Sequence, residues 1–220
     1  MATQMSTAGV TRAYDRWAPI YDLVFGPVFR RGRSDAIVAA EQVAGPAGGR
    51  IIEVGVGTGI SLPSYARTSR IVAVDLSNAM LDKARARVRA QQLSNVELVA
   101  TGDAEALQFA DNSFDVVVAQ YVVTACPRPE RALDEFVRVC RPGGEIIITT
   151  RVGAGEGLRG AIERTLMPIT SRLGFRTEFP WSRYEAWAAG RPDVRLAENR
   201  PLPPFGHFSL VRYQKIERQN

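Results

Sequence analysis

Gly55, Gly57 and Gly59 alternate directly after the aliphatic run 51–54, which is interrupted only by Glu53. Glycines at the carboxyl end of a buried strand let backbone N–H groups and a helix N-terminus approach a ligand closely. A carboxylate does not help to bind phosphate, so Glu53 favours a ligand with a positive or hydroxylated part. The third glycine also comes one residue too early for the G-x-G-x-x-G pattern of dinucleotide sites. A tight turn without a ligand is the alternative interpretation.

Two acidic residues follow this glycine loop at positions typical of a nucleoside site. The run 70–75 is a second predicted strand that ends at Asp75, about twenty residues after the loop, where such folds place the carboxylate that binds ribose hydroxyls. A third predicted strand, 95–100, is followed by Asp103. Either acid could instead act as a cap, because Asp75 precedes the predicted helix 77–92 and Asp103 could cap a turn.

The central region alternates between strand and helix signals. Further strands are predicted at 114–119 and 145–150, with a helix at 130–139 between them. Proline and glycine in the segment 140–144 end that helix before the next strand begins. This alternation predicts a doubly wound α/β sheet.

The carboxyl-terminal region predicts a pair of strands, 194–199 and 208–214, joined by the proline-rich turn 201–206. A short helix is expected before them, with its aromatic residues in the hydrophobic core beneath the pair. A lining for a lipid or amine pocket is the alternative. These aromatic residues are Trp181, Tyr184 and Trp187.

The composition predicts one soluble domain with an anionic partner. The net charge of +5 and isoelectric point near 9.6 leave nucleic acid, an anionic membrane surface or an acidic small substrate as candidate partners. No apolar run approaches the ~20 residues that span a bilayer, and no secretory signal pattern opens the chain, so we expect a cytoplasmic protein. Cys126 and Cys140 lack metal-ligand spacing and are expected to be buried thiols. With a single histidine, a multi-histidine metal centre is excluded.

Residues 1–34 precede the predicted sheet and carry apolar side chains at helical steps, with arginines interleaved among aromatics. Pro19 and the pair Gly26-Pro27 are expected to break this segment into short helical pieces. An amphipathic, arginine-bearing segment with aromatic residues is typical of a membrane interface. We therefore predict a lid and membrane-contact segment at 1–34 on a catalytic domain at 35–220. A lid without membrane contact is the alternative.

Two other arginine-bearing stretches lead to different predictions. One is a second basic amphipathic stretch, which supports membrane contact and has its apolar face at Leu158, Ile162, Leu166, Ile169 and Leu173. The other lies on the predicted helix 77–92 and is expected to be a solvated face, formed by Arg85, Arg87 and Arg89.

The region 50–150 as a whole resembles the class I S-adenosylmethionine-dependent methyltransferases. The resemblance implies a Rossmann-like α/β fold with a mostly parallel seven-stranded sheet, helices on both faces and a terminal antiparallel hairpin. It implies that Glu53 and the three glycines hold the methionine part of the cofactor, that Asp75 binds the ribose, and that Asp103 lies near the adenine. The other positions that it implies are Leu76, Met80 and Ala104 at the adenine, and Gln120 and Tyr121 where the sulfonium faces the substrate.

Three segments extend the resemblance to the soluble-type bacterial phosphatidylethanolamine N-methyltransferases, namely 16–26, the glycine loop 53–59 and the turn 203–206. This resemblance implies N-methylation of phosphatidylethanolamine in up to three rounds, toward phosphatidylcholine, on the cytoplasmic face of the inner membrane. The partners that it implies are the phospholipid surface and the lipid substrate, with no nucleic acid. Related quinone-ring methyltransferases share the N-terminal aromatic and Tyr-Asp element, so a quinone precursor or soluble small molecule is the alternative substrate.

Methyl transfer to an amine requires mainly alignment of a neutral lone pair and exclusion of water. The residues that could accept the amine proton or hold the amine are, in order of preference, Tyr21 and Tyr121, followed by Tyr14 and His207. Packing within the lid is the alternative for the tyrosines, and a structural hydrogen-bond donor is the alternative for the histidine. Arg31 and Arg212 are the candidates for binding the lipid phosphate, because the planar guanidinium suits phosphate oxygens. A solvated surface charge is the alternative for either arginine. A NAD-dependent oxidoreductase and a basic membrane- or nucleic-acid-binding module are the remaining alternatives.

Overall fold

The computed structural model describes residues 9, 11, 12, 15, 21–151, 180–202 and 208–217. Several predictions concern residues outside these ranges. They are those for Tyr14, for the amphipathic stretch 158–173, for the turn 203–206 and for His207.

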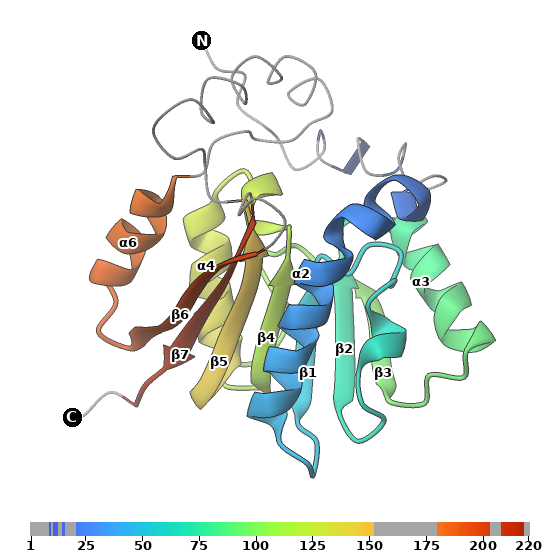
Figure 1. Ribbon diagram of the computed structural model, residues 1–220, viewed down its shortest axis with the longest axis horizontal. Coiled ribbons are helices and arrows are strands. Elements are labelled where there is room, and N and C mark those ends of the chain that lie inside the picture. Colours follow the sequence, from blue (N-terminus) through green and yellow to red (C-terminus); the bar gives the residue numbers. More distant parts are fainter. Residues whose placement is uncertain are drawn as a thin grey trace.

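A seven-stranded sheet forms the centre of the molecule, in the order β3-β2-β1-β4-β5-β7-β6 (Figure 1). Neighbouring strands among the first five are parallel, whereas β7 is antiparallel to both β5 and β6. This confirms the predicted mostly parallel α/β sheet with a terminal antiparallel hairpin. The strands are β1 (Arg50–Val54), β2 (Arg70–Asp75), β3 (Val96–Thr101), β4 (Phe114–Gln120), β5 (Cys140–Thr150), β6 (Val194–Leu202) and β7 (Phe208–Lys215).

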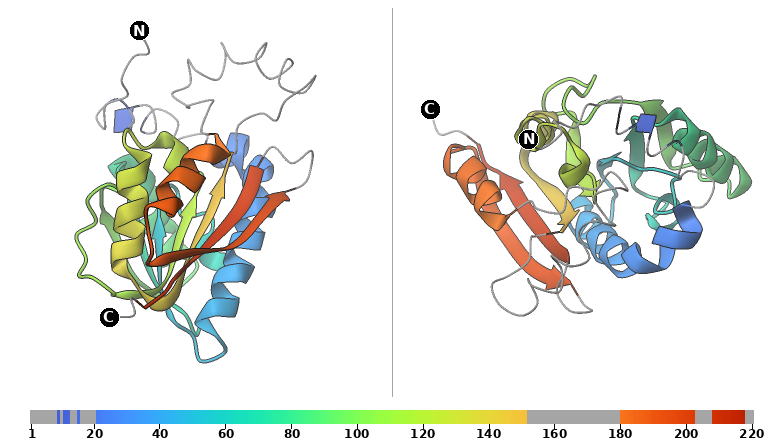
Figure 2. Two further views of the ribbon diagram at one scale, coloured as in Figure 1. Left: turned by 90° about the vertical axis from the view of Figure 1, so that its left-hand side faces the viewer. Right: turned by 90° about the horizontal axis from the view of Figure 1, so that it is seen from above.

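Helices cover both faces of the sheet, as Figure 2 shows. On one face lie α2 (Tyr21–Ala44) and α3 (Asn78–Ala90), and on the other lie α4 (Pro129–Val139) and α6 (Trp181–Ala189). Two short 3-10 helices, η1 (Leu62–Ser64) and η2 (Val123–Ala125), follow β1 and β4.

Alternate side chains of the strands enter two separate hydrophobic cores, as expected for a sheet covered on both faces. Ile51 of β1 packs with α2 and α3, whereas Ile52 packs with α4 and α6. Tyr184 of α6 is fully buried beneath the hairpin, which confirms the predicted core role of that helix. Cys126 and Cys140 are buried free thiols, also as predicted.

α2 runs without interruption through the pair Gly26-Pro27, so the predicted break at that pair is wrong. A proline inside a helix costs about 3 kcal/mol, because one backbone hydrogen bond is lost and the preceding turn is crowded. Further along α2, small and aliphatic residues such as Ala36 and Ile37 are buried against the sheet, and this burial offsets the local cost. The predicted boundary between segments 1–34 and 35–220 therefore falls inside one helix.

β5 begins at Cys140, earlier than the predicted strand 145–150, and includes the Pro-Gly-Gly segment. The pairing of β5 with β4 shifts register across this segment. A Cβ at Gly144 would lie 2.4 Å from the carbonyl oxygen of Asp115, so only glycine permits this close approach of the two strands.

Candidate functional site

A pocket opens beyond the carboxyl ends of β1, β2 and β4, where the chain order reverses across the sheet. Open α/β sheets bind ligands at such switch points. The structure brings ten of the predicted site residues together around this pocket. They are Tyr21, Gly55, Gly57, Asp75, Leu76, Met80, Asp103, Ala104, Gln120 and Tyr121.

The glycine loop leaves β1 in left-handed backbone conformations that favour glycine. Gly55 has φ +74°, and a Cβ there would lie 2.8 Å from the side chain of Val122. Gly57 has φ +55°, and a Cβ at this residue would meet no atom within 4 Å, so its backbone faces open space. Gly59 lies behind the pocket, packed on α3. The loop is therefore closely packed at Gly55 and Gly59, whereas a ligand can approach its backbone at Gly57.

Glu53 lies beneath this loop and is only 2% exposed. The Ser61 hydroxyl donates to its carboxylate, with Oγ 2.8 and 2.9 Å from the two oxygens, and the Gln120 amide donates at 3.0 Å. Burial raises the pKa of Glu53 to about 7, although the Ser61 hydrogen bonds and the charge of Arg33 act in the opposite direction. A cation bound beside this carboxylate would favour its ionised form.

The Gln120 side-chain oxygen is buried and accepts no hydrogen bond in the described part of the chain. Its orientation follows from Glu53, because the amide nitrogen faces the carboxylate and the oxygen must point away. An unsatisfied buried acceptor costs roughly 1–3 kcal/mol until a donor reaches it. Glu53 and Gln120 therefore suit a ligand group that is positive and rich in N–H donors, such as the ammonium of an amino acid.

Asp75 links β2 to the glycine loop. One carboxylate oxygen accepts the Gly57 N–H at 2.8 Å, and the other accepts the Ser77 N–H at 2.9 Å. Burial raises the pKa of Asp75, whereas these backbone hydrogen bonds act to lower it. The N-cap of α3 is Ser77, whose hydroxyl accepts the Met80 N–H at 3.1 Å, so Asp75 does not cap this helix. Each carboxylate oxygen of Asp75 also has a second lone pair that can accept a ligand hydroxyl.

Asp103 and Ala104 form the next part of the pocket wall after β3. Asp103 accepts the Glu105 N–H at 2.9 Å, so it closes a turn as the alternative interpretation expected. Beside it, Leu76 and Met80 line the pocket with apolar surface. This combination of an apolar slot and an acid at its edge suits a flat heterocycle that carries an amino group.

Asp22 fastens the start of α2 to the glycine loop, a role that the sequence did not predict. It accepts hydrogen bonds from the Thr58 hydroxyl and, at 2.6 Å, from the Arg87 guanidinium. Burial acts to raise the pKa of Asp22, but these two hydrogen bonds outweigh it and the pKa is lowered. Arg87 also donates to the Thr58 carbonyl at 2.8 Å, so the prediction of a solvated face is wrong for Arg87. The arrangement holds Tyr21 at the pocket.

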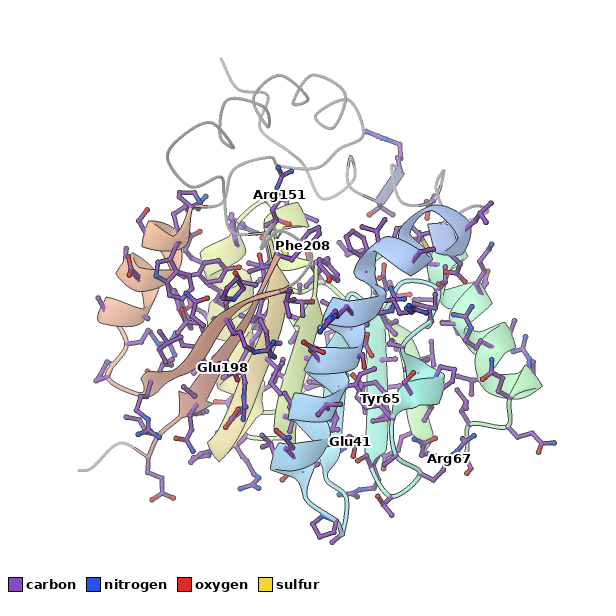
Figure 3. The ribbon with its side chains drawn as sticks, in the orientation of Figure 1. Glu41, Tyr65, Arg67, Arg151, Glu198 and Phe208 are labelled. Atoms are coloured by element: carbon purple, nitrogen blue, oxygen red, sulfur yellow. The ribbon has the colours of Figure 1, made fainter. Side chains whose placement is uncertain are left out.

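Tyr121 belongs to an aromatic cluster with Phe29 and Phe208. Its ring stacks on Phe29 at 4.0 Å between centroids and meets the edge of Phe208 at 5.2 Å. Figure 3 shows Phe208 near Arg151, at the end of the sheet where β5 ends and β7 begins. Tyr121 has φ +60°, a strained conformation for a large side chain and one that is frequent at functional sites. The backbone of Gly32 lies directly against its hydroxyl.

Burial raises the pKa of both Tyr21 and Tyr121 to about 12. Both hydroxyls therefore keep their protons at neutral pH. This favours a role in holding an amine, through the hydroxyl oxygen or the ring face, over a role in accepting its proton.

The two arginines predicted to bind phosphate do not line the pocket. Arg31 is exposed on α2. Arg212 lies opposite Ile147 within the sheet and pairs with Glu145 at 2.8 Å and Glu198 at 3.2 Å, so its charge is already neutralised. Arg33, which was not among the residues predicted to bind phosphate, directly follows Gly32, whose backbone lies against the Tyr121 hydroxyl.

Comparison with known proteins agrees with this geometry. A methyltransferase domain family matches residues 52–148. The chain is 38% identical over 213 residues to the phosphatidylethanolamine N-methyltransferase of Cereibacter sphaeroides, covering 96% of this chain and 100% of that protein. It is 34% identical over 142 residues to the demethylmenaquinone methyltransferase of Renibacterium salmoninarum, covering 63% of this chain and 57% of that protein.

Among solved structures, an S-adenosylmethionine-dependent methyltransferase from Thermotoga maritima has the same fold, with a TM-score of 0.66 and 22% identity over 94% of this chain and 99% of that one. The glycine loop, the buried acceptors beneath it and the near-full-length relative lead to one conclusion. The chain belongs to the class I S-adenosylmethionine-dependent methyltransferases.

Proposed function

We propose that this methyltransferase N-methylates phosphatidylethanolamine, and its monomethyl and dimethyl forms, toward phosphatidylcholine at a membrane surface. The observation that carries the proposal is the similarity to a phosphatidylethanolamine N-methyltransferase along nearly the whole chain. The relative named for a quinone matches over only 63% of the chain. The tyrosines and the aromatic cluster beside the pocket supply groups that can hold an amine as it gains methyl groups.

In this proposal, the residues that line the pocket, together with Glu53 buried beneath the glycine loop, each bind one part of the cofactor. Glu53 and Gln120 accept hydrogen bonds from the ammonium of the methionine part, and Asp75 accepts them from the ribose. Asp103 receives the adenine amino group, and the apolar slot holds the ring, lined by Leu76, Met80 and Ala104. When bound, S-adenosylmethionine supplies an electrophilic methyl group on a sulfonium.

The residues on the acceptor side then act mainly by positioning. Tyr21 and Tyr121 hold the headgroup amine with its lone pair toward the methyl group, and Phe29 excludes water beside them. Since both hydroxyls stay protonated, the amine loses its proton to water before it docks. The same aromatic surfaces attract the headgroup more strongly as methylation makes its charge permanent.

A surface on the first half of α2 is the proposed membrane contact. Leu23 is 80% exposed and Val28 is 59% exposed, and the exposed arginines Arg30 and Arg31 follow them. Exposed apolar side chains beside cations suit an anionic bilayer interface. No helix in the described ranges is long and apolar enough to cross a membrane. We therefore propose peripheral binding at the cytoplasmic face of the membrane.

A quinone precursor is the second candidate acceptor, because several relatives are named for quinone methylation. The aromatic cluster could also pack against a flat ring. Both reactions use the same cofactor, so the two candidate functions differ only in the molecule that accepts the methyl group.

Removal of the Asp75 carboxylate is expected to weaken cofactor binding. Loss of a charged hydrogen-bond acceptor costs on the order of 1.5–3 kcal/mol, so Asp75→Ala should bind S-adenosylhomocysteine roughly ten- to a hundredfold more weakly. Calorimetry measures the affinity for S-adenosylhomocysteine. The control is Asp82→Ala, which removes an exposed carboxylate on α3. Unchanged affinity in a folded Asp75→Ala protein would contradict the ribose assignment.

Supplied with radiolabelled S-adenosylmethionine, the protein is expected to label phosphatidylethanolamine vesicles and vesicles of the monomethyl and dimethyl lipids. Parallel reactions contain demethylmenaquinone or free ethanolamine. Label in the quinone or the soluble amine, with none in any of the three lipids, would overturn the lipid proposal and leave only the methyltransferase family.

Loss of the exposed apolar pair on α2 is expected to weaken membrane binding. A fully buried aliphatic side chain contributes roughly 1.5–3 kcal/mol, so even partial insertion predicts that Leu23→Ser/Val28→Ser reduces vesicle binding about tenfold or more. Flotation with anionic vesicles measures this, and Leu196→Ser, at an exposed leucine of β6, is the control. Equal flotation of all three proteins would show that this surface does not contact the membrane.

A further inference from the structure

We propose that Arg33, assisted by Arg30, binds the phosphate of the acceptor lipid in a groove between α2 and η1. The groove is separate from the cofactor pocket, and neither Arg31 nor Arg212 lines it. This inference rests on the proposed lipid substrate and identifies how its anionic part is recognised.

The groove combines cations, hydroxyls and a small apolar surface. Arg30, Arg33 and Ser34 contribute from α2, and Ser61 and Ser64 contribute from the segment around η1. Guanidinium and hydroxyl donors are the usual partners of phosphate oxygens. Ile37 and Ile60 also line the groove and can pack against the carbon atoms attached to a phosphodiester.

Among the residues that the structure describes, Arg33 has no carboxylate partner, unlike many of the other arginines. Arg87, Arg138 and Arg212, for example, all form ion pairs. Within the described residues, the Arg33 guanidinium donates only to the Gly26 carbonyl, at 2.6 Å, and neither Arg33 nor Arg30 forms an ion pair. A half-buried positive charge without a counter-ion attracts an anion.

Asp22, the acidic residue of the groove, forms no ion pair with Arg33 in the described part of the chain. Its carboxylate is engaged by Thr58 and Arg87. Burial lowers the pKa of Arg33, yet an arginine remains charged at neutral pH. The groove therefore keeps a net positive character.

The groove is connected to the reacting centre through side chains. Ser61 lines the groove and donates to Glu53, which also accepts a hydrogen bond from Gln120 in the wall of the cofactor pocket. Arg33 directly follows Gly32, whose backbone lies against the Tyr121 hydroxyl. Only two carbons separate phosphate from amine in an ethanolamine headgroup. The proposal therefore requires a short headgroup to extend from Arg33 to Tyr121.

Arg33→Gln tests the assignment, with Arg89→Gln, at an exposed position on α3 outside the groove, as the control. Methylation is measured against the mole fraction of phosphatidylethanolamine in vesicles. Arg33→Gln is expected to raise the apparent KM roughly ten- to a hundredfold, with a smaller change in kcat, and Arg89→Gln is expected to stay within about twofold of wild type. Melting temperature and S-adenosylhomocysteine affinity should be the same in all three proteins.

A binding experiment separates this inference from the proposed function. Glycerophosphoethanolamine and inorganic phosphate are titrated separately into protein saturated with S-adenosylhomocysteine and followed by NMR. Wild type and Arg89→Gln should bind glycerophosphoethanolamine more tightly than phosphate, and Arg33→Gln should bind neither. If no ethanolamine lipid is methylated, the proposed function fails, while this titration still decides the role of Arg33.

The inference is overturned if Arg33→Gln behaves like Arg89→Gln in either experiment, or if wild type does not bind glycerophosphoethanolamine. Equal affinity for inorganic phosphate and glycerophosphoethanolamine would overturn the assignment to a lipid headgroup.

Discussion

A carboxyl group buried at the end of the first strand is the constraint around which the site is built. Burial holds the pKa of Glu53 near 7. Because this lies above the unfolded value of 4.5, the contribution of Glu53 to stability is present below pH 4.5 and is lost as pH rises through 7. Between these two pH values, the shifted pKa of Glu53 lowers the free energy of unfolding by on the order of 3 kcal/mol. Above neutral pH, a bound cation would compensate this cost, which couples folding stability to cofactor binding.

Residues near Glu53 connect the cofactor pocket with α2 and the groove beside it. Ser61 donates to Glu53 and also lines the groove beside α2. Asp22 holds the start of α2 to the glycine loop and to α3, which brings Tyr21 to the pocket. In the proposed function, the methyl donor and the acceptor are therefore aligned by one continuous set of contacts. That arrangement suits a reaction that depends on positioning more than on a strong base.

The cofactor side of the site could be predicted from sequence because its residues follow strands in a fixed order. Asp75 and Gln120 end β2 and β4, and parallel strands bring their carboxyl ends to one edge. The acceptor side could not be predicted in this way. Helix α2 continues through Pro27 because of its packing on the sheet, which no local pattern records. Arg33 and Arg212 look equivalent in sequence, and only long-range pairing with Glu145 and Glu198 distinguishes them.

The ionisation of Glu53 on cofactor binding is the most direct test of this account. Calorimetric titration with S-adenosylhomocysteine at pH 6.5, in buffers of different ionisation enthalpy, counts the protons released. The account predicts that wild type releases roughly three-quarters of a proton per ligand at pH 6.5 and almost none at pH 8.5. Glu53→Gln, which keeps the shape of the side chain, should release none at either pH. Equal proton release by wild type and Glu53→Gln would contradict the account.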